Sequence, residues 1–203
     1  MFSALTTGIV CAATMLGVSY ALNRWLAGRP LVIDVYPMLL YGSAVFCLAI
    51  IMEVVVNTAY TLLVGEKLWA YHVYPRHDRN VSLLAPLIWF AYGIHLYFAD
   101  QGLSRRLPAG FKGDRARALI TGLDAPLVFE VTGNLVFLAL LGDYYAYYLP
   151  DDLWHLTSLR VIPLYMLSIY IGLRILRWCA ARPRHWGLPL GFYGAGLLFL
   201  FSG

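Results

Sequence analysis

Two glutamates lie within otherwise apolar stretches, and each is followed four residues later by an asparagine. Glu53 precedes Asn57 in MEVVVNTAYTLLVGEKLWAY, and Glu130 precedes Asn134 in FEVTGNLVFLALLGDYYAYY. On a helix, this spacing places both side chains of a pair on the same face. An apolar environment favours the neutral carboxylic acid, which can donate a proton, while an ionised partner can accept one or stabilise a cation. The two pairs are therefore the candidates for acid–base catalysis.

Each asparagine could hold the neighbouring carboxyl group in place. A side-chain amide donates hydrogen bonds to a carboxylate and accepts one from a carboxylic acid, so we expect Asn57 and Asn134 to orient the two glutamates. Ionisable groups at the centre of a bilayer cost about 2.5–3.5 kcal/mol on insertion scales and usually mark a functional site. The structural alternative is that protonated glutamates only hydrogen-bond neighbouring helices together.

The composition indicates a membrane-embedded protein. Hydrophobic residues make up 61% of the 203 positions and charged residues only 13%, whereas soluble domains carry about 25% charged residues. The net charge of +4 does not come from a basic stripe with exposed aromatics, so no nucleic-acid partner is expected. We expect one all-α domain, 1–203, built as a bundle of six transmembrane helices of roughly 20 residues each. Their predicted ranges are 2–23, 37–64, 81–99, 118–142, 161–181 and 187–202.

The two glutamate–asparagine pairs belong to an internal repeat with a shift of 77 residues. We expect repeat A at about 45–106 and repeat B at about 122–183, so that predicted helices two and three match helices four and five in a parallel repeat. Gly65 follows Glu53 after twelve residues, Gly142 follows Glu130 at the same distance, and each glycine is expected to close its helix. That length of helix is roughly 18 Å, near the middle of a hydrocarbon core of roughly 30 Å. Both carboxyl groups could therefore face one cavity at the same depth.

Charges in the connecting segments predict the orientation. The first, third and fifth loops hold eleven Lys and Arg residues, and the second and fourth loops hold four. Positive residues are enriched in cytoplasmic loops, so both termini are expected outside the cytoplasm, in a multi-pass protein of a bacterial inner membrane. The first positive charge comes after the first apolar stretch, which argues against a cleavable signal peptide.

Aromatic side chains supply candidates for substrate binding, since the chain has 15 Tyr, 10 Phe and 6 Trp. Tyr60 continues the glutamate–asparagine face of its helix. Trp69 and Tyr71 follow this helix and are explained either by an interfacial belt or by the mouth of a cavity. Trp89 and Tyr92 lie inside the next predicted helix, where a belt does not explain them, so we expect them to line the cavity.

No metal or cofactor is expected. His72, His77 and His95 lack a standard ligand spacing, the three cysteines form no CxxC motif, and acidic motifs that hold a metal–diphosphate group are missing. Asp124 lies six residues before Glu130 and projects away from it on a helix. We interpret Asp124 as a helix-capping or interhelical group.

The layout of the first repeat resembles a group of small intramembrane isoprenoid enzymes. The similar features are Glu53, the segment GEKLWAY that follows it, and the proline-containing entry to the next helix, APLIWFAY. The group includes the carotenoid hydratases and the heterodimeric lycopene cyclases and, more distantly, the fungal membrane terpene cyclases. The resemblance covers about 45–100 and, more weakly, 122–175. Lycopene cyclases carry a Pro-x-Glu-Glu motif at this helix start, but Ile88 and Trp89 occupy the two acidic positions here, which argues against lycopene cyclisation.

The resemblance implies metal-independent, proton-initiated cyclisation, hydration or isomerisation of an apolar isoprenoid or terpenoid lipid. Under this hypothesis, Glu53 or Glu130 protonates the substrate, and the other carboxylate stabilises the cation or takes the final proton. Two non-enzymatic alternatives remain open. The chain could be a lipid- or pigment-binding subunit or an assembly factor of a membrane complex. It could also be a proton-coupled transporter, although one short polar stripe per repeat is little to line a path.

Overall fold

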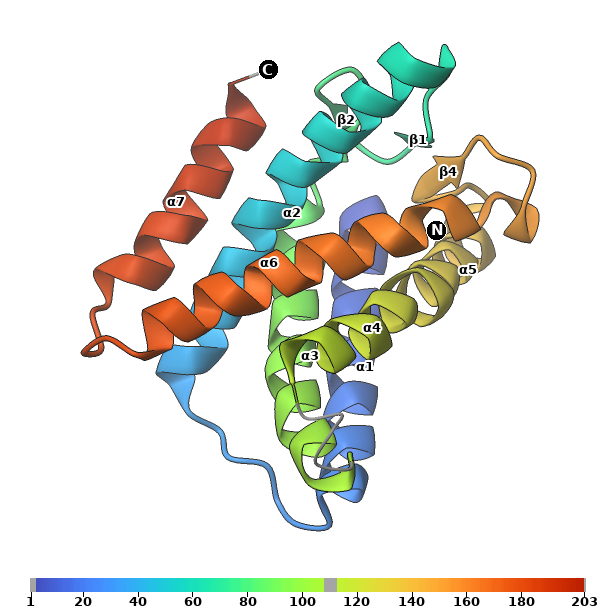
Figure 1. The fold of residues 1–203 in the computed structure, drawn as a ribbon. Helices are drawn as coiled ribbons and strands as arrows, with labels where there is room; N and C mark the ends of the chain where they lie inside the picture. Colours follow the sequence, from blue (N-terminus) through green and yellow to red (C-terminus); the bar gives the residue numbers. More distant parts are fainter. Residues whose placement is uncertain (1–2, 108–112, 203) are drawn as a thin grey trace.

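The computed structural model describes residues 3–107 and 113–202. The chain is mostly helical, and its helices form a bundle with short strands at one end (Figure 1). A long helical run in the middle of the chain consists of three segments in series, the second of them π-helical. The helices are α1 (Ala4–Ala27), α2 (Val35–Val64), α3 (Ala85–Arg106), α4 (Asp114–Asp124), the π-helix η2 (Ala125–Glu130), α5 (Val131–Leu141), α6 (Ile162–Ala180) and α7 (Gly187–Phe201).

Within residues 3–107 and 113–202, four helices are long and apolar enough to cross a membrane. They are α1, α2, the run Arg115–Leu141 and the segment Leu159–Ala180, which contains α6. The protein is therefore embedded in a membrane, as the composition indicated. Helix α7 is apolar but shorter, with 15 residues, and it packs along α2 (Figure 1).

Helix α3 is more polar than α1, α2, α6 and α7. It packs against α1, α2 and α4, and half of its residues are buried. Its approach to α2 is close, because a Cβ atom at Gly93 would lie 2.5 Å from the backbone oxygen of Tyr41. A helix that meets protein on several sides tolerates polar residues such as His95 and does not need the hydropathy of the four long apolar helices.

Three of the helical segments end at glycines in the left-handed conformation. Gly28 (φ 66°) follows α1, Gly65 (φ 85°) follows α2 and Gly142 (φ 74°) follows α5. Glycine adopts positive φ without a steric cost, and its N–H bonds a carbonyl of the last turn. The sequence prediction that Gly65 and Gly142 close their helices is confirmed.

Short strands and turns lie in the connections that follow α2 and α5. They have few residues each and form two small antiparallel sheets, β1 with β4 and β2 with β3. These elements are β1 (Trp69–Tyr71), β2 (Pro75–Arg76) and β3 (Val81–Ser82) in the first connection, and β4 (Ala146–Tyr148) with the 3₁₀ turns η3 (Leu153–His155) and η4 (Leu159–Val161) in the second.

The pairing of β1 with β4 fixes the relative direction of two helices. Trp69 lies opposite Tyr148, and Tyr71 lies opposite Ala146. Because β1 comes soon after α2 and β4 comes soon after α5, the pairing brings the C-terminal ends of α2 and α5 to the same end of the bundle. The two helices therefore run in the same direction, and so do α3 and α6, which start from that end.

An aromatic cluster forms the core where α2, α3, η2 and α6 meet. Phe46 on α2 and Tyr92 on α3 are fully buried. The indole of Trp89 contacts the rings of Tyr92, Phe129 and Tyr165, with centroid distances of 5.7, 6.1 and 6.2 Å. Trp89 thus joins α3 to η2 and to α6 at the place where the candidate site lies.

Candidate functional site

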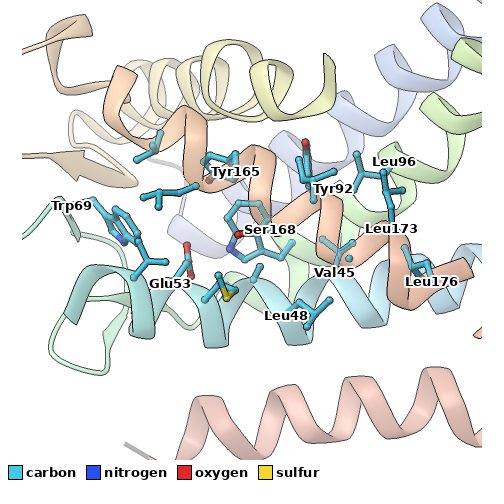
Figure 2. A pocket seen from close by; sticks show the side chains of 18 of the residues that line it. Val45, Leu48, Glu53, Trp69, Tyr92, Leu96, Tyr165, Ser168, Leu173 and Leu176 are labelled. Carbon is cyan, nitrogen blue, oxygen red and sulfur yellow. The ribbon is translucent and has the colours of Figure 1, made fainter. Parts of the chain in front are cut away.

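A mostly apolar cavity, here called the first cavity, lies between α2 and α6, with side chains of α3 completing its wall (Figure 2). Its volume is about 100 Å³, of the same order as the apolar cavity of about 150 Å³ that takes up benzene in an engineered protein. Glu53 and Trp69 lie at one end, and Leu96, Leu173 and Leu176 lie at the other (Figure 2). The cavity therefore has one end with a carboxyl group and one end that is purely aliphatic.

Glu53 lines the first cavity with one of its two oxygens unpartnered. Its side chain is only 9% exposed. The hydroxyl of Tyr71 donates a hydrogen bond to Oε1, whereas Oε2 has no hydrogen-bond partner among the described residues. The indole N–H of Trp89 interacts with Glu53 but forms no hydrogen bond of normal geometry, and Trp89 Nε1 is likewise unpartnered. A buried polar atom without a partner is costly and marks a place where a ligand can bind.

Tyr71 determines which oxygen of Glu53 carries a proton. Burial raises the pKa of Tyr71 well above its ordinary value, and the charge of Glu53 raises it further. The phenol therefore stays protonated and acts as a donor, so Oε1 accepts. When Glu53 is protonated, the proton resides on Oε2, the oxygen that no side chain holds.

Glu130 lies in a different environment. Thr157 Oγ1 donates to its Oε2 at 2.5 Å, the hydroxyl of Tyr165 donates to its Oε1, and the hydroxyl of Tyr148 also interacts with it. Glu130 is the last residue of the π-helix η2, whose first turn contains Pro126. A proline has no N–H to donate to the preceding turn, and π-helical turns are frequent at functional sites.

Glu130 lines a second cavity of about 30 Å³, together with Tyr71 and Tyr145. Trp89 and Tyr148 line both cavities. The expectation that both glutamates face one cavity is therefore not met: each lines its own, and the two cavities adjoin at a shared tryptophan and tyrosine. Glu130 is bonded by Thr157 and by Tyr165, and Tyr165 separates it from the first cavity, which this tyrosine lines.

The amide of Asn57 is bonded to the connection that follows α2. Its Nδ2 donates to Trp69 O at 2.8 Å and to Asn80 Oδ1 at 2.7 Å, and its Oδ1 accepts from Leu68 N at 2.8 Å and from Trp69 N at 3.4 Å. These four bonds use the full capacity of an amide. Asn57 therefore does not orient Glu53, which corrects the expectation from the i,i+4 spacing.

Asn134 makes the corresponding bonds at the end of α5. Its Nδ2 donates to Ala146 O at 2.8 Å and to Leu156 O at 2.6 Å, and its Oδ1 accepts from Tyr145 N at 2.9 Å and from Ala146 N at 3.1 Å. Asn134 does not orient its glutamate either. In both cases the connection folds back over its helix, and its buried backbone groups form hydrogen bonds with the asparagine amide. A connection exposed to solvent would bond water instead and leave the amide available to the glutamate.

The predicted aromatic residues divide between the cavities. Trp69, Trp89 and Tyr92 line the first cavity, and Trp89 and Tyr71 line the second. Tyr60 lines neither cavity; its hydroxyl accepts a hydrogen bond from Arg160 at 2.5 Å. Tyr60 lies two turns beyond Glu53 on α2, where Arg160 of the connection after α5 reaches it.

Three residues contact Glu130 and were not predicted to do so from the sequence. Tyr148 lies 77 positions after Tyr71, so the repeat register could have identified it. Thr157 and Tyr165 stand where the first repeat has an asparagine and an isoleucine. No pattern within the repeat indicates that these two side chains bind a carboxyl group.

A second polar cluster connects α1, α3 and α4. His95 Nε2 lies 2.7 Å from Asp124 Oδ2, and His95 Nδ1 lies 2.8 Å from Ser19 Oγ. Asp124 is thus an interhelical group, one of the two interpretations from the sequence. The order Ser–His–Asp is that of a hydrolase triad, but neither cavity reaches Ser19. Among the described residues, no group of three His, Cys, Asp or Glu side chains could hold a metal ion.

Comparison with protein-family models, with curated proteins and with solved structures gives no significant match. What the fold and the site define is a class: a membrane-embedded helical protein with a buried carboxyl group at the end of an apolar cavity.

Proposed function

We propose that this protein is an intramembrane enzyme in which Glu53 protonates an isoprenoid or terpenoid lipid and so starts its cyclisation, hydration or isomerisation. One observation carries the proposal. A buried carboxyl group has one oxygen held by Tyr71 and the other unpartnered at the end of an apolar cavity. Such a group can donate a proton to an alkene that enters from the lipid phase. The substrate class follows from the resemblance of the first repeat to small isoprenoid enzymes.

The finer architecture belongs to the same proposal: six spans, a parallel duplication, and both termini outside the cytoplasm of a bacterial inner membrane. Two observations support the duplication. The amide bonds of Asn57 to Leu68 and Trp69 recur 77 positions later, from Asn134 to Tyr145 and Ala146. The register of β1 with β4 is also symmetric under that shift, as expected for two copies related by a two-fold axis.

In the proposed reaction, the electrons of the alkene form a new C–H bond with the proton of Glu53. The products of this step are a carbocation and the Glu53 carboxylate. The faces of Trp69 and Trp89, which line the same cavity, stabilise positive charge there. The cation then cyclises onto a second alkene, takes up water, or loses a proton.

Glu130 is the proposed acceptor of the final proton. Tyr148 and Tyr165 both line the first cavity, and both interact with Glu130. A phenol between a cation and a carboxylate can pass on a proton without a net change of its own. The second carboxylate thus communicates with the substrate through two tyrosines instead of touching it.

The shape of the cavity indicates how the substrate lies. On α6 the lining extends from Leu164 to Leu176, which is roughly 18 Å of helix. Gly172 lies in this part, and a Cβ atom there would meet only Leu48, at 3.8 Å. The reacting end of an elongated apolar molecule therefore lies beside Glu53, and its tail extends toward the aliphatic end.

The test is the product pattern of lipid extracts from an isoprenoid-producing host that expresses the protein. We expect the Glu53→Gln variant to form at least about 100-fold less product, because general acid catalysis contributes about 10²–10⁴-fold. Glu66→Gln is the matched control, since Glu66 is exposed in the connection after α2. Unchanged products from a folded Glu53→Gln variant would remove the enzymatic function. An apolar molecule that is bound unaltered by both variants would instead support the non-enzymatic pigment- or lipid-binding alternative.

A further inference from the structure

The second cavity is too small for the proposed substrate and large enough for a water molecule, which the few polar groups in its mostly apolar wall could bind. Its volume is about 30 Å³, whereas a water molecule needs at least roughly 10–15 Å³ of such space and two to four polar partners. Four residues of its lining carry oxygens that can serve as these partners: Tyr71, Glu130, Tyr145 and Tyr148.

The hydroxyl of Tyr145 is buried in this region without a normal hydrogen bond. Its ring is held by Phe137 and Tyr71, with centroid distances of 4.9 and 5.1 Å, and the side chain of Ser82 interacts with its hydroxyl. Burial raises the pKa of Tyr145, so the group remains a phenol and needs an acceptor. A bound water would supply that acceptor.

The position of this cavity gives such a water a connecting role. Tyr71 lines the second cavity while it donates its own proton to Glu53 on the other side. Its oxygen therefore has lone pairs to accept a hydrogen bond from the cavity. Glu130 lines the same cavity. A single water between them would join the two carboxyl groups through one phenol.

We propose that the second cavity binds water and that this water returns a proton from Glu130 to Glu53 through Tyr71. Glu130 gives a proton to the water, the water gives a different proton to the Tyr71 oxygen, and Tyr71 gives its original proton to Glu53 Oε1. A half-turn of the carboxyl group then exchanges its two oxygens and presents this proton to the first cavity. Water and tyrosine end unchanged, and the net result is the transfer of one proton. This step rests on the proposed function: it resets the acid after Glu53 has protonated the substrate and Glu130 has taken the final proton.

The water site is tested without substrate, by stability and by density. In the Tyr145→Phe variant the ring stays and the hydroxyl is lost. If the cavity holds water, the unfolding midpoint does not rise, and a high-resolution experimental structure shows density within hydrogen-bond distance of Tyr145 and Tyr71. A dry cavity gives the opposite result, because removal of an orphaned buried hydroxyl is stabilising. A higher midpoint together with an empty cavity would overturn the proposal.

The return of the proton is tested by kinetics on the Tyr71→Phe variant. We expect the steady-state rate to fall about tenfold or more below the rate of the first turnover, because the variant loses the reset in addition to the hydrogen bond that holds Glu53. A purely structural defect would slow both phases equally, and that result would overturn the relay. Tyr144→Phe is the matched control, since the Tyr144 hydroxyl bonds only the exposed Trp154 carbonyl, at 3.2 Å. If the wild type forms no product, the proposed function and the relay both fail, whereas density and stability still decide the water site.

Discussion

The regions around the two glutamates share a backbone framework and differ in the side chains that surround the carboxyl group. Asn57 and Asn134 use their full capacity on the connections that fold back over their helices, with partners that match after a shift of 77 residues. Glu53 nevertheless has one bonded oxygen, while both oxygens of Glu130 are bonded. Both regions therefore share the asparagine-to-backbone bonds, but the hydrogen bonding of the two carboxyl groups differs.

Under the proposed function, this difference lets one framework support an acid and an acceptor. A carboxyl group with an unpartnered oxygen can reach a substrate with its proton, which suits Glu53 beside the first cavity. Both oxygens of Glu130 accept hydrogen bonds, from Thr157 and Tyr165, so under the proposed function a proton reaches this group through Tyr165 and not from the substrate directly. The assignment of roles therefore rests on the contacts of each carboxyl group rather than on depth in the membrane.

The largest expected effect is the unequal response of the two glutamates to the same substitution. Glu53→Gln removes the proton donor and is expected to lower product formation at least about 100-fold. Glu130→Gln leaves the donor in place and is expected to lower it only about tenfold. The measurement is product yield per folded protein in lipid extracts. A Glu130→Gln variant that loses more activity than Glu53→Gln would reverse the assignment of acid and acceptor.

The asparagines are expected to respond equally, since their bonds match. Asn57→Ala and Asn134→Ala each leave buried backbone groups of the connection unpaired. We expect each to lower the free energy of unfolding by about 2 kcal/mol, measured by denaturation in detergent. If only one of the two variants is destabilised, the two connections are not held in the same way, and the case for a duplication weakens.

A smaller effect is expected from the tyrosine on α6 that has no counterpart in the first half. Tyr165→Phe removes the donor to Glu130 Oε1 and keeps the ring in the wall of the first cavity. Loss of a hydrogen bond that contributes about 1 kcal/mol corresponds to roughly a fivefold lower rate. The rate is compared with that of Tyr170→Phe, on the same helix but outside both cavities. An unchanged rate would show that Tyr165 only fills space.

The smallest effect is expected at the surface, where the two connections meet. Burial acts to raise the pKa of Asp143, but hydrogen bonds from His72 and from the N–H of Tyr144 outweigh it and hold the pKa below its ordinary value of 3.8. The stabilisation is therefore complete above 3.8 and is lost as the pH falls below the lowered value. Asp143→Asn is expected to cost less than about 1 kcal/mol at neutral pH and nothing in strong acid. A difference from the wild type that persists in strong acid would contradict this origin.

The sequence was sufficient for those features that depend on local pattern. The spans α2 and α6 follow from apolar length, and Gly65 and Gly142 close their helices because a left-handed residue is needed there. Hydropathy alone does not establish α3 as a span, since this helix is packed against protein and carries polar residues such as His95.

The contacts of the glutamates could not be predicted in the same way. The i,i+4 spacing suggested that Asn57 bonds Glu53. Instead, the connection after α2 folds back over the helix and forms four hydrogen bonds with the Asn57 amide. Tyr165 reaches Glu130 only because α6 packs against the α4–α5 run. Both outcomes depend on tertiary packing between segments that are distant in sequence, which neither periodicity nor composition encodes.

The most direct test of the central claim is an experimental structure of the protein purified with an isoprenoid lipid. We expect elongated density in the first cavity between α2 and α6, with its reacting end within contact distance of Glu53 Oε2 and its tail toward Leu176. Ordered lipid bound only to the outer surface of the bundle, with the first cavity filled by side chains or water, would contradict the claim.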